Sequence, residues 1–242
     1  MKFGEMTEMK RILIKLSGEA LKNGLAGSDL YDHAFVDRVA LALKESVDAG
    51  YELALVVGAG NIWRGREGGE MDRTAADRMG MLATVINAIC LKDALVRVGV
   101  KASVMTAVPM EPLAEAYSAD EAKRRLSDGE VVIFGAGLGI PFLSTDTTGA
   151  VRSAEISADA MLMAKNIDYI YTDDPKKNPD AVRLERVKAS EVLAMNLKAI
   201  DATATAFCLS VGMPIHVFGL KEPSDIAKAI KGECVGTVIT PD

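Results

Sequence analysis

The sequence contains few cysteines, few aromatic residues and no excess of positive charge. Its three cysteines, Cys90, Cys208 and Cys234, are odd in number and widely spaced along 242 residues. They therefore frame neither a disulfide scaffold nor a zinc site, and we expect them to be reduced and mostly buried. The formal net charge of −6 argues against a protein that binds nucleic acid through a general positive field. Any phosphate ligand would have to be held by local positive groups.

The chain also lacks a hydrophobic leader and a long apolar run. Residues 1–11 are polar and contain glutamates, and no stretch of about eighteen consecutive apolar residues occurs. We therefore expect a soluble cytoplasmic protein that does not bind a membrane. Hydrophobic residues make up 49% and charged residues 26%, which is typical of a folded globular chain. The length suits one large α/β domain or two small lobes.

The segment from Arg11 to Ala20 is predicted to be the central strand and the turn that ends it. Ile12, Leu13, Ile14 and Leu16 form the short apolar run of a strand buried on both faces of a parallel sheet. Lys15 lies inside this run, and burying an ammonium group is costly unless an anion meets it. Lys15 therefore indicates an anionic ligand. The alternative is an edge strand from which Lys15 reaches solvent.

Two further predicted strands also run directly into turns of small residues. Leu53–Val57 is followed by Gly58–Asn61, and Val131–Phe134 by Gly135–Pro141. One glycine-rich turn after a strand is weak evidence, but three that alternate with helices are what a parallel sheet with a phosphate-binding edge requires. Because ligands of open α/β sheets bind beyond the carboxyl ends of the strands, we expect all three turns at one edge.

The remaining pattern alternates helices and strands without a clear linker. Hydrophobic spacing and capping residues predict helices near 32–50, 74–98, 120–127, 144–156, 202–211 and 224–231, and strands near 101–108, 160–164, 216–218 and 237–239. A proline-bounded polar loop occupies 172–179. A coarse boundary near Gly149 separates an acceptor-side half, about 10–149, from a donor-side half, about 150–240, of one continuous sheet.

The candidate site combines these turns with a small number of cations. The sequence has no P-loop motif and no dinucleotide-binding fingerprint. Lys15, Arg64 and Arg73 would supply positive charge, and Asp146, at a helix start, could orient Lys15 or contact a metal ion. This set favours phosphoryl transfer, in which the protein positions anions and neutralises charge. Since a phosphate acceptor is already ionised, no general base is required.

Taken singly, several of these residues also have simpler interpretations. Arg64 and Arg73 could be solvated surface charges, and Asp77 an exposed residue on the helix near 74–98. Tyr171 could be a core tyrosine with a wet hydroxyl. His33 and His216 are the only histidines, and neither lies near one of the glycine turns.

Five segments, taken together, resemble the uridylate (UMP) kinase branch of the amino acid kinase family. They are Lys15–Ala20, Gly58–Gly65, Asp77–Thr84, Pro141–Asp146 and Thr172–Pro175, and they occur in the order of that family. The resemblance extends from about residue 10 to residue 240. It implies a three-layer α/β/α sandwich with a mainly parallel sheet, and an ATP- and Mg²⁺-dependent conversion of UMP to UDP in pyrimidine nucleotide biosynthesis. It further implies a homohexamer, with UTP as a feedback inhibitor.

The resemblance also implies roles for individual residues. Catalysis would depend on Lys15 and Asp146. ATP would be bound by Lys15, Leu16, Ser17, Gly18, Gly60, Arg64, Lys165, Asn166, Tyr171 and Asp174, with Asn166 or Lys165 in the adenosine pocket. UMP would be bound by Ala59, Asp77, Leu138, Gly139, Ile140, Pro141, Phe142, Leu143, Ser144 and Thr145. No residue is assigned as a direct metal ligand.

Two positions depart from the pattern of this family. Ala59 replaces the middle glycine of a Gly-Gly-Gly turn, which should be tolerated only where the backbone φ is negative. The segment 22–32 lacks the Gly-Phe-Gly-Ile-Asp pattern of relatives that GTP activates, so the sequence does not favour activation by GTP. Two other functions stay open: a kinase of the same fold for a carboxylate or carbamate acceptor, and a nucleotide-binding regulatory protein without catalysis.

Overall fold

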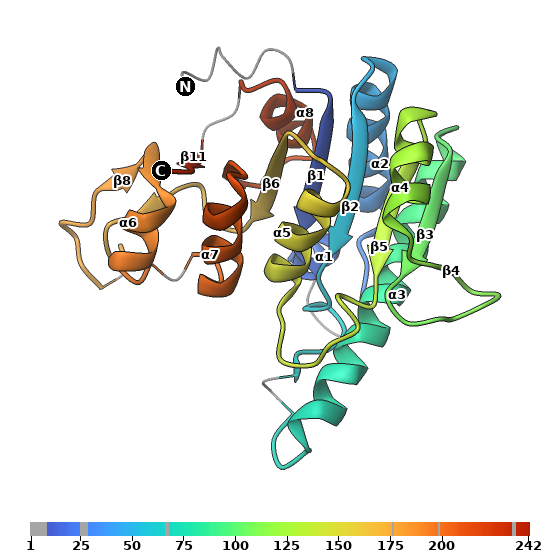
Figure 1. The fold of residues 1–242 in the computed structure, drawn as a ribbon, viewed down its shortest axis with the longest axis horizontal. Helices are drawn as coiled ribbons and strands as arrows, with labels where there is room; N and C mark the ends of the chain where they lie inside the picture. Colours follow the sequence, from blue (N-terminus) through green and yellow to red (C-terminus); the bar gives the residue numbers. More distant parts are fainter. Residues whose placement is uncertain (1–8, 25–28, 66–67, 176, 198, 234–235) are drawn as a thin grey trace.

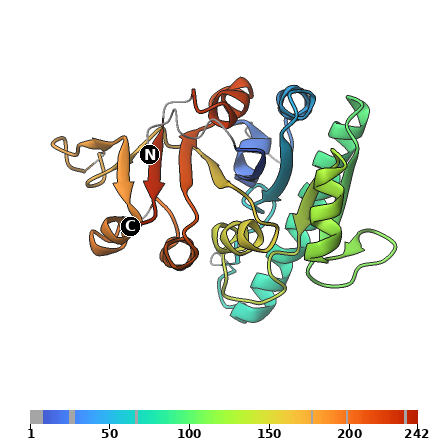
Figure 2. The ribbon, with the colours of Figure 1, turned by 45° about the horizontal axis from the view of Figure 1, so that its top comes forward.

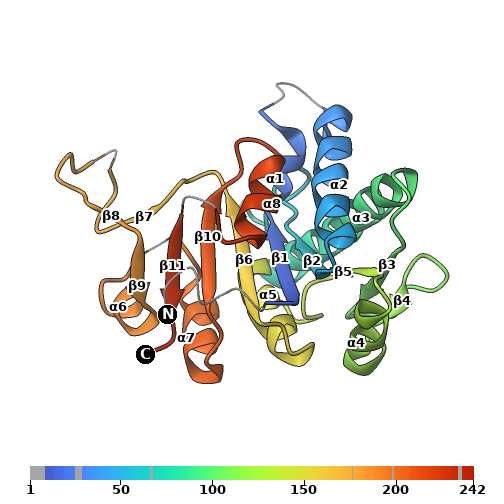
Figure 3. The same ribbon diagram turned by 90° about the horizontal axis from the view of Figure 1, so that it is seen from above.

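The chain folds into three layers, with a large sheet between two layers of helices (Figure 1). The computed structural model describes residues 9–24, 29–65, 68–175, 177–197, 199–233 and 236–242. Figures 2 and 3 show the helical layers on the two faces of the sheet from two further directions. The predicted three-layer α/β/α architecture is therefore confirmed.

The described residues form a nine-stranded sheet in the order β4-β3-β5-β2-β1-β6-β10-β11-β9. Neighbouring strands run parallel except for β10 and β11. The strands are β1 (Arg11–Leu16), β2 (Glu52–Val57), β3 (Ala102–Thr106), β4 (Glu115–Ala116), β5 (Val131–Gly135), β6 (Ala160–Lys165), β9 (Arg186–Lys188), β10 (Ile215–Gly219) and β11 (Thr237–Thr240). A separate hairpin pairs β7 (Ile170–Tyr171) with β8 (Arg183–Leu184).

Two hydrophobic clusters attach the helices to the sheet, one on each face. One face carries α1 (Gly18–Lys22), α2 (His33–Asp48), α3 (Arg73–Arg97) and α8 (Ser224–Ile230). The other carries α4 (Ala119–Ser127), α5 (Thr145–Glu155), α6 (Ala189–Ala194) and α7 (Ala202–Val211). Strand β1 pairs with β2 and β6 along its two edges, and its faces are covered by the helices, since Ile12 and Ile14 lie in one cluster and Leu13 in the other.

The central position of β1 decides between the two interpretations of Lys15. This residue is paired in register with Val56 of β2 and Met163 of β6, and it is only 7% exposed. The edge-strand interpretation is therefore wrong. A buried ammonium group lies at the carboxyl end of the middle of the sheet.

Local sequence accounts for most element boundaries. Asp32 accepts a hydrogen bond from the backbone N–H of Phe35 and begins α2, as predicted, and Ser144 does the same for α5 through Thr147. The sequence analysis did not predict α1, where it expected a turn, nor β4, β7 or the segment from β8 to α6, residues 183–194. These strands have only two or three residues each, too few to show a periodic pattern.

Helix α3 is the longest helix and extends well beyond the sheet (Figure 1). It contains an 18-residue window with a mean hydropathy of 1.6, so by length and composition it could span a membrane. The same window is 44% buried inside the protein, because one side of the helix packs on β3 and β5. The helix therefore serves as part of the core along one side.

Candidate active site

The turns after β1 and β2 contact each other through their backbones. A Cβ atom placed on Gly18 would lie 2.4 Å from the carbonyl oxygen of Gly58 and 2.8 Å from the amide nitrogen of Gly60. No side chain fits in that space, so glycine is required at position 18. This close approach forms one continuous surface of backbone groups at the carboxyl edge of β1 and β2.

Ala59 fits into this surface without backbone strain. It does not adopt a positive φ, which meets the condition that the sequence analysis set for replacing glycine at this position. The third turn, after β5, does contain a strained residue, because Ala136 has a φ of 60°. A hydrogen bond from the backbone N–H of Ala136 to the hydroxyl of Thr84 in α3 holds that turn in place.

One face of α3 holds all three segments that would surround an acceptor. Asn87, fully buried, donates a hydrogen bond from Nδ2 to the carbonyl oxygen of Gly58 over 2.7 Å. The hydroxyl of Thr84 accepts one from the backbone N–H of Ala136 over 2.9 Å. The carboxylate of Asp77 accepts one from the backbone N–H of Phe142 over 2.9 Å. Residues 77, 84 and 87 are spaced so that they lie along one side of a helix.

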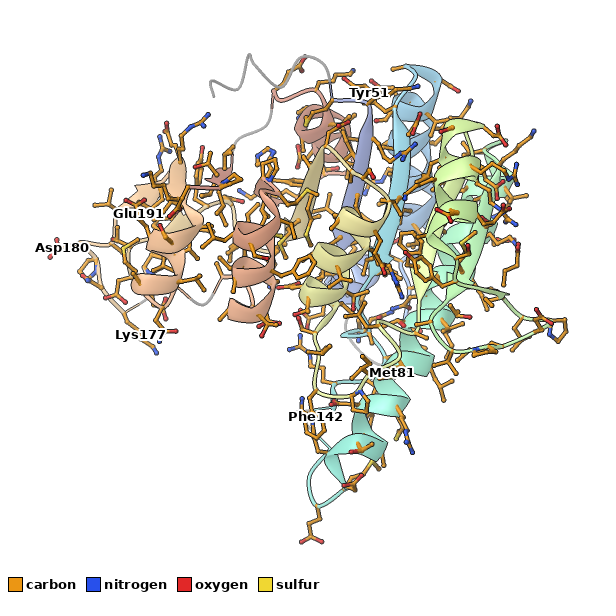
Figure 4. The ribbon with its side chains drawn as sticks, viewed as in Figure 1. Tyr51, Met81, Phe142, Lys177, Asp180 and Glu191 are labelled. Carbon is orange, nitrogen blue, oxygen red and sulfur yellow. The ribbon has the colours of Figure 1, made fainter. Side chains whose placement is uncertain are left out.

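Asp77 also binds Arg73, one helical turn earlier. The guanidinium Nε of Arg73 lies 2.9 Å from Oδ1 of Asp77, and the same group lies over the ring of Phe142, 5.6 Å from its centroid. Figure 4 labels Phe142, which lies beside the part of α3 that extends from the sheet. Arg73, Asp77 and Phe142 therefore form one cluster, and Asp77 is only 15% exposed, which argues against a freely solvated surface residue.

Two lysines meet on Asp146 at the first turn of α5. The ammonium Nζ of Lys15 lies 2.7 Å from Oδ1 of Asp146, and the Nζ of Lys165 lies 2.8 Å from Oδ2. Lys165 also donates to the carbonyl oxygen of Ala199 over 2.6 Å. Burial alone would raise the pKa of Asp146, but the two ammonium groups outweigh it and hold that pKa at about 2. Both carboxylate oxygens of Asp146 are thus committed to lysine.

Asp201 supports the same corner of the site and was not identified from the sequence. Its Oδ2 accepts hydrogen bonds of 2.6 Å from the hydroxyls of Ser144 and Thr147, and its Oδ1 caps α7 through the N–H of Thr203. Burial tends to raise the pKa of Asp201, but the two hydroxyl donors lower it overall. The position of an aspartate before the predicted helix at 202–211 was the available signal.

These groups line a cleft of about 690 Å³, the central cleft. Its walls include the Gly18 and Gly58–Gly60 turns, the Lys15–Asp146–Lys165 cluster, and Arg64, which forms an ion pair with Glu19. Among the predicted site residues, the central cleft is lined by Lys15, Ser17, Gly18, Ala59, Gly60, Arg64, Asp77, Phe142, Leu143, Ser144, Thr145, Asp146, Lys165 and Asn166. It therefore unites residues predicted for both nucleotides.

A second cavity of about 450 Å³, the outer cavity, adjoins the central cleft. It is lined by Tyr171 and Asp174 and shares Asn196, Leu197 and Ala199 with the cleft. Lys165 and Asn166 line the cleft and not the outer cavity. Neither cavity is lined by Leu16, which is buried in the core, or by Leu138, Gly139, Ile140 and Pro141.

The arrangement offers cations and backbone N–H groups that can bind anions. Among the described residues no group of three or more His, Cys, Asp or Glu side chains could hold a metal ion. The two histidines lie elsewhere: His33 begins α2, and His216 is buried in β10, where burial lowers its pKa to about 4. Backbone N–H groups and cations that converge on one point, next to a second cavity, suit the transfer of a charged group between two bound anions.

Comparison with known proteins places this geometry in context. Residues 10–219 match the model of the amino acid kinase family. The structure is similar to that of a UMP kinase from Bacillus anthracis, with 36% sequence identity, a TM-score of 0.91 and 97% of each chain covered. A UMP kinase from Ureaplasma parvum is 35% identical with a TM-score of 0.90, covering 96% of this chain and 99% of that one. A uridylate kinase from Archaeoglobus fulgidus is 27% identical with a TM-score of 0.71, covering 95% and 99%.

Proposed function

The chain belongs to the amino acid kinase family, and from this premise we propose that it is a UMP kinase. It transfers the γ-phosphoryl group of ATP to UMP and releases ADP and UDP, reversibly. The observation that carries the proposal is the cleft in which Lys15 and Asp146 lie beside the Gly18 and Gly58–Gly60 turns, with a second cavity adjoining it. Solved structures similar over nearly the whole chain, named as UMP kinases, support the choice of acceptor.

The chemistry requires positioning and charge neutralisation by the chain. An oxygen of the UMP phosphate, already ionised, forms a bond to the γ-phosphorus of ATP, while the bond from that phosphorus to the β–γ bridging oxygen breaks. The released electron pair stays on ADP, and no proton moves. Lys15, oriented by Asp146, neutralises the transferring group, and the backbone N–H groups near Gly18 and Gly58 orient the phosphates. We assign the outer cavity with Tyr171 and Asp174 to adenosine, and Asp77 with Phe142–Thr145 to UMP.

Magnesium is the expected cofactor. Both oxygens of Asp146 are bound by lysines, and the described residues form no metal cluster, so the ion would enter with ATP, held by phosphate oxygens and water. When bound, it supplies further neutralisation of phosphate charge.

The same proposal includes assembly, regulation and location. We propose a homohexamer, and exposed apolar residues on α3 support association with further copies of the chain: Met79, Leu82, Ile86, Ile89 and Val96. We place the enzyme in the cytoplasm, in pyrimidine nucleotide biosynthesis, with UTP as feedback inhibitor. The absence of the GTP-associated pattern does not favour activation by GTP, and part of that segment, residues 25–28, lies outside the described residues.

A coupled assay that detects ADP tests the proposal. The protein is given Mg²⁺-ATP with UMP, CMP, dCMP, and small carboxylate or carbamate acceptors in parallel. We expect turnover with UMP well above that with every other acceptor. Turnover with a small acid but none with UMP would assign the chain to another kinase of this fold. Nucleotide binding without any turnover would make it a regulatory protein.

A further inference from the structure

The loop between β5 and α5 begins and ends with a residue in an unfavourable backbone conformation. We call residues 136–142 the acceptor loop, because they lead from the turn after β5 into Phe142–Thr145, the segment proposed to bind UMP. Ala136, the first residue of the loop, has a φ of 60°, and Phe142, the last, has a φ of 71°. Residues other than glycine rarely adopt this left-handed region, because their Cβ atom crowds the backbone. A contact from outside the loop is needed to hold each end.

Each end is held by a hydrogen bond to a side chain of α3. The backbone N–H of Ala136 donates to the hydroxyl of Thr84, and that of Phe142 donates to the carboxylate of Asp77, both over 2.9 Å. Positions 77 and 84 are about two helical turns apart, so both side chains lie on the same side of α3. Figure 4 labels Phe142 beside this part of α3. The acceptor loop is therefore fastened at both ends to one helix.

The hydroxyl of Thr84 is arranged to accept a hydrogen bond from the loop. Its proton is donated to the carbonyl oxygen of Met81 over 2.6 Å, which leaves a lone pair of the hydroxyl oxygen for the N–H of Ala136. Thr84 is only 4% exposed and Ala136 is fully buried, so solvent does not replace this bond. A buried N–H without a partner is costly. The bond therefore opposes the return of Ala136 to a negative φ.

The strand that precedes the loop is packed too tightly to move. A Cβ atom placed on Gly135, the last residue of β5, would lie 3.2 Å from a methyl group of Val85 in α3 and 3.2 Å from a methyl group of Thr106 in β3. The backbone of Gly135 is thus enclosed between α3 and β3. Because the end of the strand is fixed, the φ of Ala136 sets the direction in which the acceptor loop leaves the sheet.

We propose that Thr84 is a positioning residue, which keeps the acceptor loop in the conformation that binds UMP by holding Ala136 in its left-handed conformation. This inference rests on the proposed phosphoryl transfer to UMP and adds a role to it. Thr84 does not line the central cleft, whereas Phe142–Thr145 do, so Thr84 acts on the acceptor through the path of the loop. Without its hydroxyl, Ala136 relaxes to a negative φ and the loop leaves β5 in another direction.

The test compares Thr84→Val, which has the same shape without a hydroxyl, with Thr84→Ser, which keeps the hydroxyl. Steady-state kinetics of the full chain give kcat and the KM values for UMP and ATP. We expect Thr84→Val to raise the KM for UMP by about five- to tenfold, the effect of one hydrogen bond. Its kcat and its KM for ATP should change by less than about twofold. All parameters of Thr84→Ser should stay within about twofold of the wild type.

Ser46→Ala is the matched control for the loss of a buried hydroxyl in a helix. Ser46 lies in α2, is 1% exposed and bonds to the carbonyl oxygen of Ala42 in its own helix, outside the cleft. We expect this variant to have the KM values of the wild type. A rise of its KM for UMP equal to that of Thr84→Val would overturn the inference.

The double variant Thr84→Val/Ala136→Gly separates positioning from general stability. Glycine adopts a φ of 60° without a Cβ penalty, so the loop of the double variant keeps its path without the hydroxyl. We expect the KM for UMP to return to within about twofold of the wild type. The free energy of unfolding, measured with urea, should still be lower than that of the wild type. A KM for UMP as high as that of Thr84→Val, or higher, would overturn the inference, because lost stability alone makes the double variant worse.

Calorimetric titration of the protein with UMP, without ATP, gives a readout independent of turnover. We expect weaker binding of UMP to Thr84→Val than to the wild type and to Thr84→Ser. Equal binding to all three proteins would overturn the inference, and so would a KM for ATP raised as much as the KM for UMP. If Thr84→Val does not fold, Thr84→Ala takes its place in each comparison.

Turnover of the wild type with UMP keeps the two failures apart. An inactive wild type would reject the proposed acceptor, and the same variants would then be measured with whichever acceptor the wild type uses. An active wild type with an unchanged KM for UMP in Thr84→Val would reject only the role of Thr84.

Discussion

At the scale of single residues, Lys15 is the group on which the proposed chemistry depends. Its ammonium group is buried in the middle strand of the sheet and bound to Asp146. We predict that Lys15→Ala loses at least about 100-fold in kcat, because a missing transition-state cation typically costs about 3 kcal/mol or more. Circular dichroism should show a folded protein. Activity close to that of the wild type would remove Lys15 from the mechanism.

A substitution at Asp77 tests where the acceptor binds. Its carboxylate holds Arg73 and the backbone of Phe142 and lines the central cleft. We predict that Asp77→Asn raises the KM for UMP by about tenfold and changes the KM for ATP little, since a charged hydrogen bond to the acceptor is lost. Asp93→Asn is the matched control, because Asp93 forms a similar ion pair with Arg97 on the same helix, outside the cleft. Equal effects on both substrates would place the acceptor elsewhere.

At the scale of elements, α3 holds the proposed acceptor side of the site in position. Asn87, Thr84 and Asp77 connect one side of the helix to the turns after β2 and β5 and to Phe142. Asn87 is further fixed by the hydroxyl of Tyr31, whose pKa burial raises to about 12. Through this network, α3 fixes the positions of these turns in addition to packing on the sheet.

We predict that Asn87→Leu raises the KM for UMP by about fivefold, because the Gly58 carbonyl loses a hydrogen bond worth about 1 kcal/mol. Leu91→Ala provides the control, since Leu91 is buried on the same helix without a polar contact. That variant should lower the free energy of unfolding through the cavity it leaves, yet keep the KM for UMP. If both variants change the KM for UMP to the same extent, the effect would come from the lower stability of the protein and not from the position of the Gly58 turn.

At the scale of the whole molecule, the opposite side of α3 remains uncovered. Met79, Leu82, Ile86, Ile89 and Val96 are each 40% to 53% exposed along it. In Figure 1 this helix extends away from the sheet, so its outer part is accessible. Helix α3 carries this apolar stripe on one side and the residues that bond the turns after β2 and β5 on the other. Contact of the stripe with a second copy of the chain would therefore act on the helix that positions these turns.

We predict that Leu82→Lys combined with Ile86→Glu reduces the assembled mass, because charges on this stripe oppose burial against a second copy. Analytical ultracentrifugation measures the mass at several concentrations. Val182→Lys changes an apolar residue that is 62% exposed on a loop near β8 and should leave the mass unchanged. A hexamer that persists in the α3 variant would exclude this stripe from the interface.

Sequence patterns predicted the long elements and the edge at which the site forms. Strands such as β1, β2 and β5 have strong apolar runs followed by small residues, so their type and ends are locally encoded. The short strands β4, β8 and β9 and helix α6 were missed because they depend on pairing with distant segments. The division into two halves near Gly149 stays a prediction, and the sheet is continuous across it through the pairing of β1 with β6.

The amino-acid sequence determined the buried lysine in the first strand, the three small-residue turns and the aspartate at a helix start, because strand period, capping and turn chemistry are local properties. Only the tertiary structure decided that Lys165 shares Asp146 with Lys15 and that one side of α3 bonds the turns after β2 and β5 and the backbone of Phe142. Those contacts join residues from 19 positions apart, for Lys165 and Asp146, to 131 positions apart, for Lys15 and Asp146. Their partners are selected by the order of the strands and the packing of helices on the sheet, which no local pattern specifies.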